Sequence, residues 1–80
     1  MLVSVMDEGY ILSNKYRRAI FDELASGEKN IDRIVKKQRI IPMVAKKVIE
    51  DFVKGGILEK KGSNYVFTEE GEKLVDSIRG

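Results

Sequence analysis

Pro42 constrains this chain more than any other residue, because it interrupts a run of apolar residues that recur with helical spacing. A proline inside a helix costs about 3 kcal/mol, whereas in the first turn its missing N–H costs nothing. One continuous helix through this region is therefore disfavoured. We predict two helices, at residues 31–37 and 42–54, joined by a tight connection at residues 38–41.

Both predicted helices are amphipathic. In the first, Asn30 is a suitable N-cap and Ile31, Ile34 and Val35 would face inward. In the second, successive residues advance by about 100°, which divides the helix into two halves. The apolar half consists of Val44, Ala45, Val48, Ile49, Phe52 and Val53. The outer half consists of Met43, Lys46, Lys47, Glu50, Asp51 and Lys54.

The charges of the second helix run against its dipole. Lys46 and Lys47 come early, while Glu50 and Asp51 follow one turn later. A helix stabilised by its own dipole favours acids early and bases late. We therefore expect these lysines to serve something other than helix stability.

Basic residues are concentrated in the same part of the chain. The net charge is +2 in total, but residues 31–61 hold nine basic and four acidic side chains, and both flanks are slightly acidic. Such a distribution is typical of a surface that meets a polyanion. It is equally typical of lysines that only solvate helix faces, so charge alone decides nothing.

The remaining elements are expected to support this central segment. A helix capped by Ser13 or Asn14 would run to about Ser26, ahead of Gly27. Residues 57–61 and 65–67 would form a hairpin around a turn at residues 62–64. Thr68 would cap a last helix at residues 69–79. We expect one domain over residues 1–80, in which residues 1–12 are an extension or a strand and residues 7–9 form a turn.

Composition excludes several function classes. The chain has no cysteine and no histidine, which removes thiol catalysis, zinc-finger ligation and a histidine general base. No phosphate loop or nucleophile motif is present, so we predict that the protein is not an enzyme and uses no cofactor or metal effector. No apolar run approaches the roughly 20 residues that cross a bilayer. The start of the chain does not resemble a secretory signal, and we expect a cytoplasmic protein.

The predicted order is helix, helix, tight turn, helix and hairpin, which is the order of a winged helix-turn-helix domain. The segments VIEDFVKGGILEKKG, ILSNKYRRAIFDELASGEKNI and YVFTEEGEKLV resemble parts of MarR- and ArsR-type bacterial and archaeal regulators. The similarity covers about residues 11–80. It implies a mainly α, α+β fold with a three-helix core, a short hairpin wing (residues 57–68) and a C-terminal helix.

This resemblance implies a transcriptional regulator that binds double-stranded DNA. The helix at 42–54 would enter the major groove, and the wing would contact the backbone or the minor groove. A homodimer is expected, formed through the N-terminal segment and the last helix, because one module buries too little surface for tight specific binding. The residues expected at DNA are Lys36, Lys37, Arg39, Pro42, Met43, Lys46, Lys47, Lys60, Lys61, Ser63 and Asn64.

Two departures from the family pattern keep a second function open. Arg39 stands where the turn usually carries glycine, and the helix begins with Ile41, Pro42, Met43 and Val44 where small polar residues are usual. An apolar start suits a protein partner as well as DNA. The alternative is therefore a winged-helix module that docks onto another protein. RNA binding ranks third, because Tyr65 and Phe67, the only candidates for base stacking in the hairpin, are more simply core residues.

Overall fold

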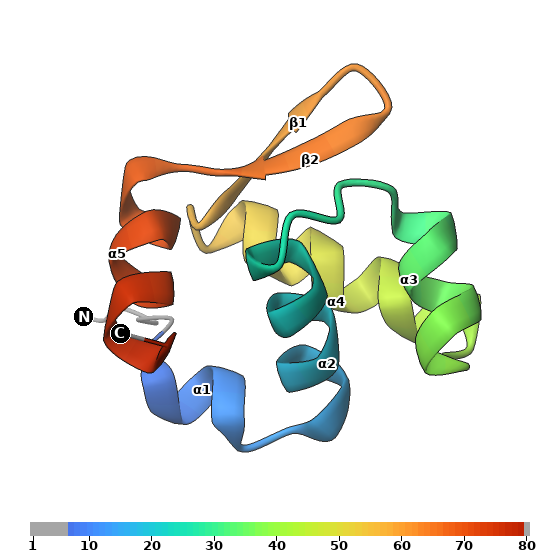
Figure 1. Ribbon diagram of the computed structural model, residues 1–80, viewed down its shortest axis with the longest axis horizontal. Helices are drawn as coiled ribbons and strands as arrows, with labels where there is room; N and C mark the ends of the chain where they lie inside the picture. Colours follow the sequence, from blue (N-terminus) through green and yellow to red (C-terminus); the bar gives the residue numbers. More distant parts are fainter. Residues whose placement is uncertain (1–6, 80) are drawn as a thin grey trace.

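The computed structural model describes residues 7–79, which form five helices and one hairpin. Figure 1 shows α2 in front of α4, with α3 at one end of this pair and α1 and α5 at the other. The hairpin extends across the top of the molecule in this view. The elements are α1 (Glu8–Leu12), α2 (Lys15–Ala25), α3 (Ile31–Gln38), α4 (Pro42–Lys54), β1 (Leu58–Lys61), β2 (Asn64–Phe67) and α5 (Glu69–Arg79).

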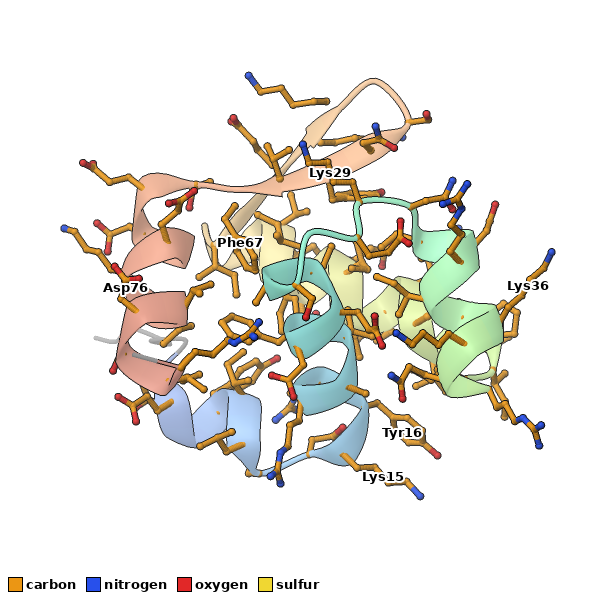
Figure 2. The ribbon with its side chains drawn as sticks, in the orientation of Figure 1. Lys15, Tyr16, Lys29, Lys36, Phe67 and Asp76 are labelled. Carbon is orange, nitrogen blue, oxygen red and sulfur yellow. The ribbon has the colours of Figure 1, made fainter. Side chains whose placement is uncertain are left out.

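The core lies between α2, α4 and the hairpin. The ring of Phe21 on α2 packs edge-on against Phe52 on α4 at 6.4 Å between centroids, and against Phe67 on β2 at 5.4 Å. Phe21 and Phe52 are fully buried. Figure 2 shows Phe67 pointing from the hairpin into this interior. Edge-to-face packing of aromatic rings stabilises such a core beyond the burial of their area.

Local signals in the sequence predicted correctly where three of the helices begin. Asn14 caps α2 by accepting hydrogen bonds from the backbone N–H groups of Tyr16 and Arg17, at 2.8 and 3.2 Å. Asn30 caps α3 by accepting from Arg33 N–H at 3.2 Å. Pro42 is the first residue of α4, as predicted. The split of residues 31–54 into two helices is therefore confirmed.

The prediction of a turn at residues 7–9 was wrong. The Asp7 carboxylate accepts a 2.9 Å hydrogen bond from Tyr10 N–H and caps α1, whose Ile11 is fully buried. Asp and Gly favour turns, but Asp is equally suited to an N-cap, and burial of Ile11 favours the helix. Residues 7–12 thus hold no strand, and the rest of the predicted extension or strand, residues 1–6, lies outside the described residues.

The hairpin is tighter than predicted. Leu58 pairs with Phe67 and Lys61 pairs with Asn64, so the turn consists of Gly62 and Ser63 alone. Gly62 has φ +63°, the sign that a type II′ turn requires at its first central residue. Asn64 therefore belongs to β2 and does not lie in the turn.

Helix α5 lies close to the start of the hairpin. Thr68 caps it, as predicted, by accepting a 3.1 Å hydrogen bond from Gly71 N–H. A Cβ on Gly71 would lie 2.1 Å from the Ile57 carbonyl oxygen and 2.9 Å from the Phe67 ring. The absence of a side chain at Gly71 therefore lets α5 pack closely against Ile57, just before β1, and against Phe67 of β2.

Candidate functional site

Helix α4 presents an exposed strip between the hairpin and α2. We call this strip the outer face; its exposed residues are Pro42, Met43, Lys46, Lys47, Glu50, Val53 and Lys54. The opposite side of α4, with Ala45, Val48, Ile49 and Phe52, is buried in the core. Core packing thus fixes which side chains α4 offers to a ligand.

The helical wheel misplaced two residues at the margins of this face. Val53 was predicted to face inward, but 38% of it is exposed at the edge of a hollow beside the hairpin. Asp51 was predicted to face outward and is half-buried. The wheel assumes that half of the helix is covered, whereas α2 and the hairpin cover α4 unevenly, and this shifts the boundary.

Lys46 and Lys47 lie in different surroundings. Lys46 lines a hollow between α3, α4 and the hairpin, together with Asp32, Glu50 and Tyr65. Lys47 lines a second hollow on the α2 side of α4, together with Tyr16 and Arg17. The outer face therefore has one lysine on the side of α3 and the hairpin and one on the side of α2.

Lys47 already has an acidic partner. Its Nζ donates a 2.9 Å hydrogen bond to the Asp51 carboxylate one turn further along α4. This hydrogen bond and the negative charge of Asp51 raise the pKa of Lys47 above its usual 10.5. Lys46 forms no ion pair with any residue in 7–79, so its charge is available to a ligand.

The backbone of the turn between α3 and α4 has an unusual conformation at Arg39. Arg39 is the only non-glycine residue of the described chain with positive φ, at φ +54° and ψ +46°, which is the left-handed region. Ile40 N–H then donates to the Val35 carbonyl at 3.1 Å, and Ile40 is buried. The turn thus reaches the left-handed conformation with an arginine where glycine is usual, at a cost of roughly 1–2 kcal/mol.

Two predicted basic residues of α3 differ in their availability. Lys36 projects away from the molecule (Figure 2) and makes no ion pair within residues 7–79. Lys37 lies 3.2 Å from the Glu23 carboxylate of α2. Glu23 is only 9% exposed and also accepts a 2.6 Å hydrogen bond from the Gln38 side chain. Lys37 therefore joins α2 to α3.

Sequence reasoning missed Glu23. The residue lies between Ile20, Phe21 and Leu24, which are all buried. Its position next to this apolar stripe was visible in the sequence. A carboxylate there requires partners, because a buried charge without them is strongly disfavoured.

The hairpin brings its own charges near the end of α4. Glu50, Lys54, Lys60 and Tyr65 line one hollow there, which connects the outer face with β1 and β2. The remaining predicted hairpin residues Lys61, Ser63 and Asn64 are exposed, and Lys61 lies 3.6 Å from Glu59. Tyr65 N–H donates to the Lys29 carbonyl at 3.4 Å, which ties β2 to the α2–α3 loop. Lys54 was not among the predicted contacts, although its position on the outer half of the wheel favoured it.

The side chains at the start of α4 are apolar. Ile41 is 65% exposed and Met43 is 79% exposed, whereas Val44 is half-buried. Ile41 caps α4 without any side-chain hydrogen bond to the first turn. The start of α4 therefore offers an apolar surface to a ligand.

Two further observations concern the described residues as a whole. Within residues 7–79, no three acidic residues are grouped as ligands for a metal ion. None of the helices in that range combines the length and the apolar character needed to span a bilayer.

A family model described as winged helix-turn-helix matches residues 16–80, which include α2 except for its first residue and every later element to α5. No curated protein and no solved structure matches the chain.

Proposed function

Because this chain belongs to the winged helix-turn-helix family, we propose that it binds double-stranded DNA as a transcriptional regulator. In this proposal α4 enters the major groove through its outer face, and the hairpin lies against the backbone or the minor groove. The main supporting observation is that the outer face carries Lys46 and Lys47, and that the end of this face lines one hollow together with Lys60 of the hairpin. We further propose a MarR- or ArsR-like regulator that acts in the cytoplasm of a bacterium or archaeon.

The proposed contacts divide by chemistry. Lys46 and Lys47 would donate to guanine O6 and N7 or to phosphates, and Met43 would contact a thymine methyl group beside Pro42. Phosphate contacts would come from the turn and the hairpin, through Lys36, Lys37, Arg39, Lys60, Lys61, Ser63 and Asn64. All of these side chains are exposed, which supports the proposal.

We also propose that two copies bind together. A single winged module buries too little surface for tight specific binding, so a second copy supplies the second half-site. The proposed contact uses the N-terminal segment and α5. It is supported by Leu12 of α1, which is 43% exposed, and by the packing of α1 against α5.

Titration of duplex DNA by fluorescence anisotropy at rising salt tests the proposal. We expect measurable binding near 50 mM salt, with log K falling linearly with log salt at a slope of about −0.9 for each phosphate neutralised. The double variant Lys46→Ala with Lys47→Ala should bind more weakly. No binding at low salt, or an unchanged affinity of the double variant, would contradict DNA binding through α4.

One observation favours a second candidate function. Ile41 and Met43, at 65% and 79% exposed, form an apolar surface that a protein partner can cover. In this alternative the start of α4 docks onto another protein. Met43→Asp would then abolish a stoichiometric complex with that partner, and the two lysine substitutions would leave the complex intact.

A further inference from the structure

Glu50 occupies the centre of the outer face. Met43 and Glu50 are seven residues apart, which places them within about 20° of each other around α4 and about 10 Å apart along it. Lys46 and Lys47 project about 40–60° to either side of this line. All four side chains are exposed. The most outward line of α4 is therefore an apolar and an acidic residue, flanked by lysines.

The carboxylate of Glu50 has no partner among the described residues. Lys46, Lys47 and Lys54 lie three or four residues away, at spacings that allow ion pairs on a helix. None of them lies within ion-pair distance of Glu50 in residues 7–79, and Lys47 pairs with Asp51. Glu50 thus retains both oxygens, with about four acceptor sites, for a ligand.

An unpaired carboxylate has a specific effect on a surface that meets DNA. Phosphates repel it, so it lowers affinity that does not depend on sequence. In the major groove, by contrast, the exocyclic amino group N4 of cytosine donates a hydrogen bond that a carboxylate accepts. Glutamate at this position therefore sacrifices general affinity and favours discrimination between bases.

From this arrangement, and resting on the proposed DNA binding, we infer that Glu50 is a specificity-determining residue that accepts a hydrogen bond from cytosine N4. The protein would then bind preferentially to DNA sites that place a C·G pair opposite the middle of α4. A protein that coats DNA regardless of sequence gains nothing from a carboxylate there. Lys46 and Lys47, on the two sides of Glu50, hold the helix in the groove through phosphates or guanine.

Selection from a randomised duplex library with the full chain tests this inference. The wild type is expected to select a motif with one C·G pair whose replacement weakens binding roughly tenfold. Glu50→Gln should lose that preference while binding unrelated duplexes more tightly than the wild type, because one negative charge is gone. The opposite directions of these two effects separate base reading from a general change in charge.

Asp51→Asn is the matched control, since it makes the same charge change at the next residue. Asp51 is half-buried and paired with Lys47, so this variant should keep the cytosine preference. An unchanged preference in Glu50→Gln would overturn the role of Glu50 and leave DNA binding intact. Binding without any selected motif would likewise overturn it. No binding to any duplex would overturn both the role of Glu50 and the proposed function.

Discussion

The ammonium group of Lys47 lies 2.9 Å from the carboxylate of Asp51, while Lys46 beside it forms no ion pair within residues 7–79. Adjacent lysines on the outer face of α4 therefore differ in the charge that they offer. The charge of Lys47 is partly neutralised before any ligand arrives. Ligand binding through Lys47 has to compete with Asp51, whereas Lys46 is available at once.

The first prediction follows from this difference. Lys46→Ala should weaken duplex binding more than Lys47→Ala, and Asp51→Asn should strengthen binding because it releases Lys47. Anisotropy titration near 50 mM salt measures all three effects. Arg18→Ala is the control, because Arg18 is exposed on α2 and belongs neither to the proposed DNA contacts nor to the proposed dimer contact. Equal losses for the two α4 lysines would contradict the assigned difference.

Glu23 is predicted to stabilise the packing of α2 against α3. Its buried carboxylate accepts hydrogen bonds from Gln38 at 2.6 Å and from Lys37 at 3.3 Å. Glu23→Ala removes the acceptor and should lower the free energy of unfolding by about 1–3 kcal/mol in denaturant titration. Asp22→Ala changes the same charge at an exposed neighbour and should stay within about 0.5 kcal/mol of wild type. Similar losses for both variants would show that net charge, not these contacts, matters.

Arg39 permits a test that separates backbone strain from charge. Arg39→Gly and Arg39→Ala both remove the guanidinium group, but only glycine relieves the left-handed conformation at φ +54°. The glycine variant should unfold with a free energy about 1 kcal/mol higher than the alanine variant. Both should lose the same fraction of DNA affinity. If the two variants are equally stable, the turn is not strained at Arg39.

Gly71 is predicted to be intolerant of a side chain. In Gly71→Ala the new Cβ would meet the Ile57 carbonyl oxygen at 2.1 Å, which requires a backbone shift. We expect a loss of about 1–3 kcal/mol in unfolding free energy, despite the better helix propensity of alanine. Gly9→Ala makes the same substitution in α1, where the nearest atom lies at 3.4 Å, and should be neutral or stabilising by up to about 1 kcal/mol. A tolerated Gly71→Ala would mean that α5 does not need this close approach.

The features that sequence predicted correctly are those that neighbouring residues decide. Asn30 and Thr68 were recognisable as caps, and Asn14 was one of two candidates beside Ser13, because a capping side chain bonds to N–H groups two or three residues away. Pro42 marked the start of α4 by its own ring geometry. Asp7 failed as a signal because the same residue type begins both turns and helices, and the burial of Ile11 decided the outcome.

The features that sequence could not supply depend on how the elements cross. Glu23 and Lys37 are separated by 14 residues and meet only because α2 packs against α3. The exposure of Val53 depends on where the hairpin ends its cover of α4. The pair of Lys47 and Asp51 was within reach of sequence reasoning, since residues four apart on a helix face the same side. The expected DNA contacts themselves stay predictions, with every side chain exposed.

Chemical-shift mapping of the backbone amides during titration with duplex DNA tests the central claim most directly. If the outer face of α4 and the hairpin form the DNA interface, the largest shifts should fall on residues 43–54 and on Gly62 and Ser63, with small shifts in α5. Shifts confined to α1 and α5, or spread evenly over the chain, would contradict the assignment of α4 as the helix that enters the major groove.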